Sequence, residues 1–454
     1  MISYFTFYIL FKKIVHCKFL KPAIIILTFI MNPVWSSNSS SQTTVDSLNI
    51  APDRDLDNSE SHFLNPLSEQ AVIDSALKNS RKLQFLNTNV EIAEYRLNSS
   101  GLIDNPELRI RDISTRYYTQ EFDEMSIGLR WQFPKPGQLG EEKQEADVRF
   151  WERKVDEIRY RQELIARVRR TYADVILYDQ LVKLAQKRVE LEDERINVIE
   201  KLTNLGRRSI VYFTKAQMWL AEAKNDYTRA LQNQVLARRR LAKRTGIPED
   251  TPLIYEELPE VTQEVEQLVD IAYANRPEIK LIDQRIELAN KQNKLEHLKL
   301  LPWPNFVEMS YHREKQRYED WGELRMGIYL PIFNWNIGNI KATALAVKKK
   351  EGESDAIRES IEEEVRTAFI AYKDLLLDFN NFQENSKNLI NNAQKVITQA
   401  NKYSALLQDE VYEMELTIID TKKLLSEKRC NLVHALMDLY YTMGIEGYDN
   451  LLQY

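Results

Sequence analysis

The sequence contains Val168-Arg169-Arg170-Thr171-Tyr172 and repeats it in altered form as Val365-Arg366-Thr367-Ala368-Phe369, about 197 residues further on. Other pairs keep nearly the same spacing: Phe133-Pro134 matches Leu330-Pro331, Gly140 matches Gly338, and Thr245-Gly246-Ile247 matches Met443-Gly444-Ile445. One constant register along so long a chain indicates a duplicated sequence. The period is too long for one unit of a solenoid, so the chain is predicted to fold as two similar halves.

Both halves are predicted to have the same order of elements, which is helix, strand pair, very long helix, turn and helix. The first structural repeat covers residues 67–260, the second covers 261–446, and a C-terminal tail follows at 447–454. Within the first repeat, an amphipathic helix is predicted at about 68–99 and the long helix at about 139–203.

Apolar residues recur every seven positions along each long helix. In the first repeat the rows are Trp151, Ile158, Ile165 and Tyr172, and then Val168, Val175, Val182, Val189 and Ile196. In the second repeat one row is Ile361, Ala368, Leu375, Phe382, Leu389, Val396 and Tyr403. A sustained seven-residue period makes helices supercoil along a narrow seam. About 65 residues at roughly 1.5 Å each span about 100 Å, so the helices are expected to form a rod or a tube.

Four short segments show the alternation of apolar and polar residues that is typical of β-strands. They lie at about 106–117, 124–133, 305–313 and 323–332, and prolines bound them. Their length suits strands that span a membrane. Aromatic residues gather near both ends, as in the girdles of an outer-membrane barrel. One group is Tyr117, Tyr118, Phe122, Tyr318 and Trp321, and the other is Trp131, Phe133, Trp303, Phe333 and Trp335.

The alternative for these strands is a soluble sheet with one buried face, which leaves the aromatic ends and the prolines unexplained. Four strands cannot close a barrel alone, and an open sheet edge is not tolerated in lipid. The protomer is therefore expected to oligomerise, and three copies would supply twelve strands.

Composition narrows the function classes. The chain has 62 Lys and Arg against 68 Asp and Glu, and the net charge of −6 argues against a nucleic-acid-binding protein. Gly is scarce at 12 residues and charged residues make up 29%, which suits long solvated helices better than a compact α/β enzyme. Cys17 and Cys430 cannot provide a disulfide framework, and Cys430 is expected to be a small buried residue.

The N-terminus is predicted to be an export signal over residues 1–36, with lysines before the apolar stretch Pro22 to Met31 and cleavage near Ser36. The alternative is an uncleaved membrane anchor. Residues 37–66 are rich in Ser, Asn, Thr and Asp and are predicted to be a disordered leader.

Three passages resemble the TolC family of outer-membrane efflux proteins, and the resemblance covers about residues 67–446. Asn275-Arg276-Pro277-Glu278-Ile279 looks like the start of the family's second repeat. Gly327-Ile328-Tyr329-Leu330-Pro331-Ile332-Phe333 looks like its passage from strand to long helix. Asn105-Pro106-Glu107-Leu108 resembles the first strand entry of the heavy-metal, RND-type efflux branch. The order and spacing of these passages carry the resemblance, since each is weak alone.

The resemblance implies a fold class that is mainly α with membrane β, built from a duplicated unit of helix, strand pair and long helical hairpin. In a homotrimer these units would form a 12-stranded β-barrel in the outer membrane of a Gram-negative bacterium, in contact with outer-membrane lipid. A periplasmic α-helical barrel would continue the channel.

The same resemblance implies a passive exit duct of a tripartite efflux system that exports small molecules or metal ions. Its partners would be a periplasmic adaptor (membrane fusion) protein and an inner-membrane pump of RND or ABC type, which supplies the energy. The duct of a type I protein secretion system is an alternative with the same architecture, and a structural coiled-coil envelope protein is an alternative from another class. The sequence lacks a phosphate-binding Gly-Lys-Ser motif and offers no Ser/His/Asp arrangement, so neither enzyme activity nor a cofactor is expected.

The predicted barrel lumen has five charged residues. They occupy the strand positions that alternate with apolar ones: Arg109, Arg111, Arg130, Arg325 and Glu308. One interpretation is a hydrated, charge-balanced pore wall without selectivity. The other is a bias towards anions, because four arginines stand against one glutamate.

The turns between long helices are predicted to form the periplasmic tip and to contact the adaptor. The first turn, at 204–209, offers Gly206, Arg207, Arg208 and Ser209. The second is predicted near 406–411, lacks a matching glycine and offers Asp409 and Glu410. Together with Glu413, these acids either ring a closed aperture or lie on a solvated turn.

No metal site is predicted from the sequence. Beyond the export signal the chain has four histidines, which are His62, His297, His312 and His434. They are scattered along the sequence, and we do not expect any of them to share a metal ion with a cysteine.

Overall fold

The computed structural model describes residues 66–115, 122–255, 258–314, 319–400 and 405–447. The chain divides into two units, Met1–His62 and Phe63–Tyr454, and all described residues lie in the second. The predicted export signal and leader therefore lie outside the described residues, apart from Pro66, as does the predicted tail apart from Gly447. The same holds for three of the predicted girdle aromatics, Tyr117, Tyr118 and Tyr318.

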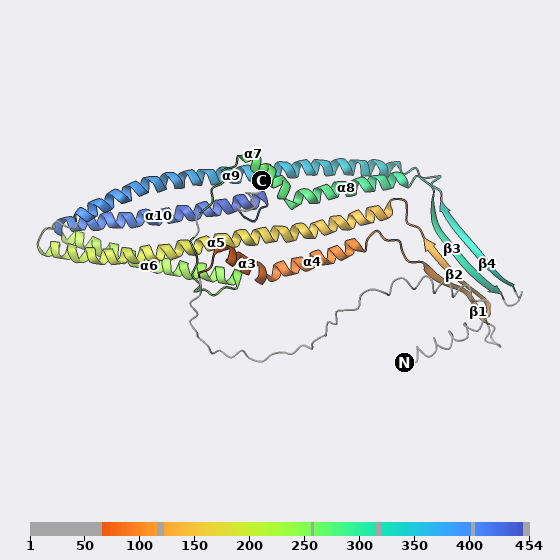
Figure 1. Cartoon of the computed structure of the whole chain (residues 1–454), viewed down its shortest axis with the longest axis horizontal. Coiled ribbons are helices and arrows are strands. Elements are labelled where there is room, and N and C mark those ends of the chain that lie inside the picture. Colours follow the sequence, from red (N-terminus) through yellow and green to blue (C-terminus); the bar gives the residue numbers. More distant parts are fainter. Residues whose placement is uncertain (1–65, 116–121, 256–257, 315–318, 401–404, 448–454) are drawn as a thin grey trace. The chain divides into compact units, whose positions relative to one another are not determined.

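The described unit consists of two successive sets of elements in the same order (Figure 1). The first set is α3 (Glu69–Asn79), α4 (Arg81–Asn98), β1 (Glu107–Thr115), β2 (Phe122–Gln132), α5 (Gln138–Asn204) and α6 (Ile210–Thr245). The second set is α7 (Val265–Asn275), α8 (Pro277–Leu298), β3 (Trp303–Glu314), β4 (Glu319–Tyr329), α9 (Ile337–Ala400) and α10 (Ala405–Met443). This order confirms the predicted fold class, including its duplication.

The two long helices have the predicted size, because α5 has 67 residues and α9 has 64. Their seven-residue rows supply the centres of two matching cores. In the first set, Ile165, Val168 and Val175 of α5 pack with α3 and α6. In the second, Ile361 and Val365 of α9 pack with α7 and α10. The short helix α3 thus packs against α5 and α6, and the short helix α7 packs in the same way against α9 and α10.

The helix predicted at 68–99 is divided into α3 and α4 at Ser80, which is a difference from the sequence expectation. Ser80 has an extended backbone, and its hydroxyl accepts a hydrogen bond from the Leu83 amide at the start of α4. The Asn79 side-chain amide donates to the Thr245 carbonyl at 2.7 Å. The equivalent helix of the second set breaks at Arg276, where Pro277 occupies the first turn of α8. Serine capping thus makes the same break that proline makes in the other half.

The second turn between long helices lies earlier than predicted. Residues 406–411 are helical and belong to α10, which begins at Ala405, and α9 ends at Ala400. The segment Ala405-Leu406-Leu407-Gln408 consists of good helix formers, so nothing in it interrupts a helix. The connecting residues 401–404 lie outside the described part of the chain.

The sheet contains four antiparallel strands in the order β1-β2-β3-β4. The pairing of β2 with β3 joins the two halves, and it runs without interruption from Glu124 opposite Glu314 to Gln132 opposite Phe306. The strands β1 and β4 form the two edges. Among the helices in the described ranges, none combines the length and the apolar character that crossing a bilayer requires.

Two glycines of the helical part provide a paired test of this fold. Gly246 ends α6 at φ +76°, and a Cβ atom there would lie 2.7 Å from Asn79 Nδ2. Gly352 lies within α9 with open space around it. We expect Gly246→Ala to lower the free energy of unfolding by about 1–2 kcal/mol, and Gly352→Ala to raise it by about 0.5–1 kcal/mol. Thermal melting followed by circular dichroism would measure both changes, and equal effects of the two substitutions would contradict the structure.

Candidate functional site: the polar sheet face and the helical tip

One face of the sheet is charged. Residues directly opposite each other on neighbouring strands share a face. Glu107, Arg130, Glu308 and Arg325 form one such row across the four strands, and Arg109, Gly128, Ser310 and Glu323 form the next. All five charged residues predicted for the lumen therefore lie on one face of the sheet. Four of them, Arg109, Arg111, Glu308 and Arg325, line one small depression together with Ser126, Gly128, Ser310 and His312.

Glu308 is the centre of this polar face. It is only 4% exposed. One of its carboxylate oxygens lies 3.2 Å from Arg111 Nη2, and the other lies 3.6 Å from Arg109 Nη1. The Arg130 guanidinium lies over the Phe306 ring, 4.0 Å from its centroid. The buried carboxylate thus offsets much of the charge of the nearby arginines.

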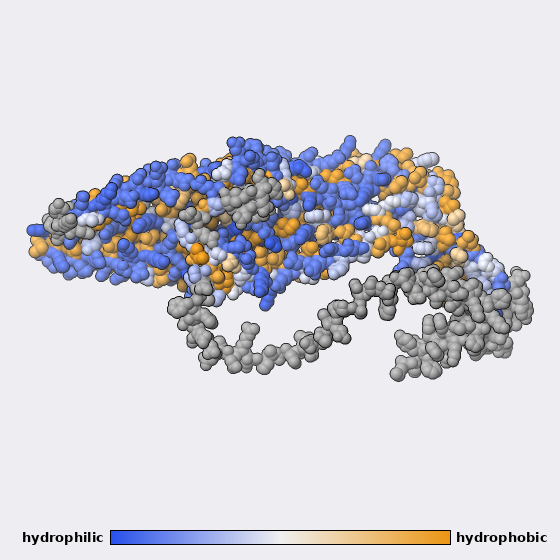
Figure 2. Space-filling view, in the orientation of Figure 1, coloured by the Kyte–Doolittle hydropathy of each residue, from blue (hydrophilic) through white to orange (hydrophobic). Residues whose placement is uncertain are grey.

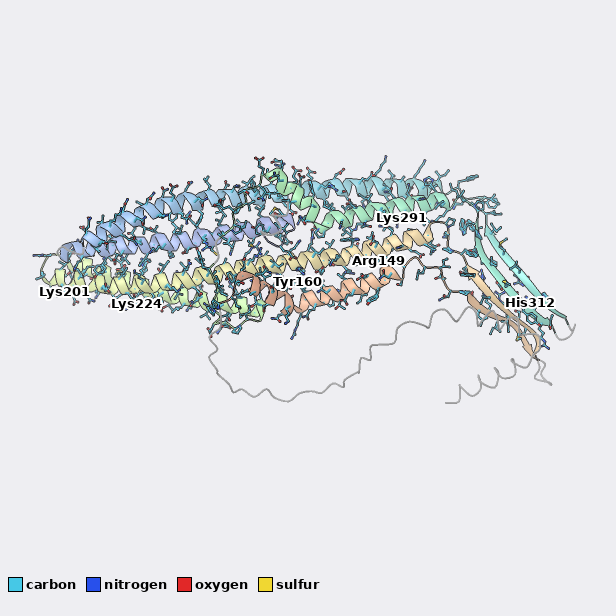
Figure 3. All side chains as sticks on the ribbon, in the orientation of Figure 1. Arg149, Tyr160, Lys201, Lys224, Lys291 and His312 are labelled. Atoms are coloured by element: carbon cyan, nitrogen blue, oxygen red, sulfur yellow. The ribbon has the colours of Figure 1, made fainter. Side chains whose placement is uncertain are left out.

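A second group of polar contacts lies nearer the far end of β3. The Arg325 guanidinium donates to Glu323 at 2.6 and 2.7 Å, and His312 Nε2 lies 3.0 Å from the same carboxylate. His312, labelled in Figure 3, stacks on Trp321 with ring centroids 5.1 Å apart. Trp321 therefore lies on the polar face, which differs from the predicted girdle position towards lipid.

The opposite face of the sheet is apolar, and the described residues leave it uncovered. Leu108, Leu129, Met309 and Leu324 form one row across the strands, and Leu324 is 70% exposed. Other large exposed apolar residues on this face are Ile110, Ile127, Trp131, Tyr311, Met326 and Ile328. This arrangement is the inverse of a soluble sheet, which buries its apolar face.

The described aromatics at the helical end of the sheet fall into two groups. Phe333 is 97% exposed and Trp335 is also exposed. Trp131 stacks on Phe133 with centroids 6.4 Å apart. Trp303 is buried because it stacks on Tyr329 at 4.3 Å. Four of the five residues predicted for this girdle are thus available to an outside surface, and Trp303 is not.

The turn between α5 and α6 is compact and hydrogen-bonded. Gly206 has φ +69°, and the amides of Arg207 and Arg208 donate to the Leu202 carbonyl at 2.8 and 3.3 Å. The Ser209 hydroxyl accepts from the Tyr212 amide at the start of α6. We define the tip as residues 200–213, at the end of α5 marked by Lys201 in Figure 3. Sequence reasoning missed the exposed apolar residues of this tip, which are Leu205, Ile210 and Val211.

Asp409 does not lie on the surface of the tip, which corrects its predicted role in a ring of exposed acids. It is 1% exposed and bridges three elements. Arg195 Nε of α5 donates to one carboxylate oxygen at 2.8 Å. Arg208 Nη2 and the Tyr212 hydroxyl of α6 donate to the other, at 3.0 and 2.9 Å. Glu410 remains exposed, and Glu413 lies 3.9 Å from Arg195.

Burial and hydrogen bonding act together on the groups around Asp409. Burial opposes the charged form of Arg195, but the hydrogen bond that Arg195 donates to Asp409 and the attraction of that carboxylate together outweigh burial and raise the pKa of Arg195 above its usual value. Burial, with the carboxylate beside it, raises the pKa of the Tyr212 hydroxyl. Arg195 therefore stays charged and Tyr212 stays neutral at physiological pH, as the hydrogen-bond pattern requires.

A further group of side chains was also missed from the sequence. Within the described residues, Asp174, Cys430 and His434 are the only set of three whose ligand atoms lie close enough to hold one metal ion. Cys430 and His434 are four residues apart on α10 and so share one helix face, which was the available signal. Cys430 is 6% exposed, as predicted, and burial raises its pKa to about 12.

Comparison with known proteins agrees with this architecture. Residues 72–247 match the family described as outer membrane efflux protein. The match covers most of the first set of elements, from within α3 to just beyond the end of α6. The match confirms the resemblance noted in the sequence. No curated protein sequence matches the chain.

Several solved structures share the fold over both halves. The Campylobacter jejuni CmeC outer membrane channel is 14% identical with a TM-score of 0.62, over 90% of this chain and 96% of that one. The open state of the Neisseria gonorrhoeae MtrE outer membrane channel is 18% identical with a TM-score of 0.61, over 83% and 89%. CusC, studied for its folding and transmembrane channel formation, is 16% identical with a TM-score of 0.62, over 84% and 93%. The chain thus has the fold of outer-membrane efflux channels.

Removal of the Asp409 carboxylate should destabilise the helical tip. In Asp409→Ala the buried Arg195 loses its main partner, and an unpaired buried charge typically costs about 3–5 kcal/mol. The exposed neighbour offers a control, because Glu410→Ala should change the free energy of unfolding by less than about 0.5 kcal/mol. Thermal melting of the purified protein would compare them, and an unchanged melting temperature for Asp409→Ala would argue against the buried bridge.

Proposed function

We propose that this chain is one protomer of an outer-membrane export channel, a passive duct driven by an inner-membrane pump. The observation that carries the proposal is the inverted sheet, with an exposed apolar face and a charged face centred on the buried Glu308. Lipid would cover the apolar face, and water in the lumen would cover the charged face. The alternative of a structural coiled-coil protein in the periplasm does not explain a sheet with an exposed apolar face.

The edges of the sheet favour a closed homotrimer. With β1 and β4 at the two edges, the described part of each protomer leaves backbone groups unpaired on both sides of the sheet. Lipid cannot satisfy those groups, so β1 of one protomer is proposed to pair with β4 of its neighbour. Three protomers close a ring of about twelve strands, which lies within the range of outer-membrane barrels.

The long helices support a duct that crosses the periplasm. Hydrophilic residues cover much of their visible face in Figure 2. At about 1.5 Å per residue, the 67 residues of α5 extend for about 100 Å. The six long helical pairs of a trimer would enclose a tube of that length, and the tip would meet its partner at the far end from the sheet.

The tip is the proposed contact for a periplasmic adaptor, which links the duct to a pump of RND or ABC type. Leu205, Ile210 and Val211 are exposed there beside Arg207, a mixture of apolar and cationic groups that suits a protein partner. Gly206 and Ser209 shape the turn that presents them. The cargo is proposed to be small molecules or metal ions, and a type I secretion duct would differ in carrying protein.

Membrane fractionation tests the proposed assembly. The full chain should be found in the outer membrane and should migrate as a trimer in detergent, because strand pairing between protomers satisfies the sheet edges. Leu324→Arg on the apolar face should reduce insertion, by about 2–4 kcal/mol near the midplane, whereas Arg325→Lys on the polar face should insert normally. A monomer in the soluble periplasmic fraction would refute the channel.

Pore conductance tests the polar face. In Glu308→Gln the arginines Arg109 and Arg111 lose their shared counter-charge, so the reversal potential in a salt gradient should shift towards anion preference. Glu107→Gln, near the start of β1, changes the same net charge at an exposed site and should shift it less. An unchanged reversal potential in Glu308→Gln would show that Glu308 does not line the conducting path.

A further inference from the structure

Three side chains from two long helices meet at one point. Asp174 belongs to α5, while Cys430 and His434 lie one turn apart on α10. The Cys430 sulfur lies 3.6 Å from Asp174 Oδ1 and 3.7 Å from His434 Nε2. His434 Nε2 lies 3.1 Å from the same Asp174 oxygen. The three donor atoms thus form a nearly regular triangle.

This triangle has the size of one face of a tetrahedral zinc site. Zinc binds sulfur at about 2.3 Å, histidine nitrogen at about 2.0–2.1 Å and carboxylate oxygen at about 2.0–2.2 Å. At tetrahedral angles these bond lengths place sulfur about 3.6 Å from the nitrogen or the oxygen, and nitrogen about 3.4 Å from the oxygen. Each observed distance lies within about 0.3 Å of its expected edge, so small side-chain shifts would bring all three atoms to one ion.

The surroundings favour three protein ligands and one open position. Cys430 is buried, as are Val175, which follows Asp174 on α5, and Val433, which precedes His434 on α10. The side chains of Asp174 and His434 are 28% and 36% exposed, so solvent would reach the ion from the side of these two ligands. The nearby cation Arg244 is held on Thr171, one turn earlier on α5.

We propose that Asp174, Cys430 and His434 bind a transition-metal ion of the Zn²⁺ class, with water in the fourth position. The Cys430 thiol would lose its proton to solvent and bind as a thiolate, since a coordinating metal deprotonates the thiol. His434 would bind through the neutral Nε2 and Asp174 through one oxygen. The soft sulfur and the imidazole select this class over Mg²⁺ and Ca²⁺. The ion would link α5 to α10 within one protomer.

Without a metal the same three groups can satisfy one another. The thiol then donates to Asp174, and His434 pairs with the same carboxylate. A hydrogen-bonded triad is thus the competing explanation. The two explanations differ in one respect, because only the metal site forms a metal–sulfur bond.

Cobalt titration would detect that bond. The full chain, purified in detergent with Cys17→Ser so that Cys430 is the only thiol, is reduced, freed of metal with a chelator and titrated with Co²⁺. We expect a thiolate-to-cobalt charge-transfer absorption that saturates at one ion per chain. Zn²⁺ should abolish the absorption, and Mg²⁺ in excess should leave it unchanged.

Substitutions assign the ligands. Cys430→Ser should remove the charge-transfer absorption, and Asp174→Asn and His434→Gln should each weaken Co²⁺ affinity by more than about 100-fold, beyond the loss of a secondary contact. His297→Gln, a histidine on α8 outside the cluster, should bind Co²⁺ like the parent chain. Circular dichroism of each variant would establish that it is folded.

Two outcomes would overturn the proposal. One is the absence of a charge-transfer absorption in the folded parent chain, which would leave the hydrogen-bonded triad. The other is an affinity in Asp174→Asn and His434→Gln equal to that of the parent, which would place the cobalt elsewhere. Neither outcome bears on export, because the test measures binding alone.

Discussion

The narrow apolar seam of the long helices is the constraint on which the rest of this structure depends. A seven-residue period leaves each helix with a strip of buried residues along its length, and the strip must be covered along that whole length. In α5 it is covered by α6 and α10, and at its base by α3, with Val168 and Val175 fully buried. The second half repeats this at α9 with α7 and α10, where Val365 is fully buried. A helix so long cannot fold back on itself, so neighbouring helices must cover it.

The seam also explains where charge is buried. Side chains beside the apolar rows face a neighbouring helix and need a partner on it, because an isolated buried charge is costly. Arg195 and Asp409 meet this need from α5 and α10, with Tyr212 of α6 completing the bridge. Near the middle of the same helix pair, Asp174 meets Cys430 and His434. Both groups couple α5 to α10 through polar contacts, where apolar packing alone would allow the helices to slide.

Sequence reasoning succeeded where a pattern is local and periodic. The heptad rows predicted α5 to within a few residues and a second long helix in the matching place, and period-two alternation predicted the four strands and which residues share the polar face. It failed where a single side chain decides whether a helix continues or is interrupted. Ser80 breaks a helix by capping, although serine elsewhere lies within helices. The second turn was expected near 406–411, and those residues belong to α10.

Contacts between α5 and α10 could not have been predicted at all. Whether Asp409 is buried depends on the axial register of two helices separated by more than two hundred positions in the sequence, and an α-helix moves a side chain by about 1.5 Å per residue. A shift of one turn would move Arg195 away from Asp409 and Asp174 away from Cys430 together, because both pairs lie between the same two helices. The two polar groups therefore depend on one register and also maintain it, so that a change at either should be felt at the other through the rigid helices that join them.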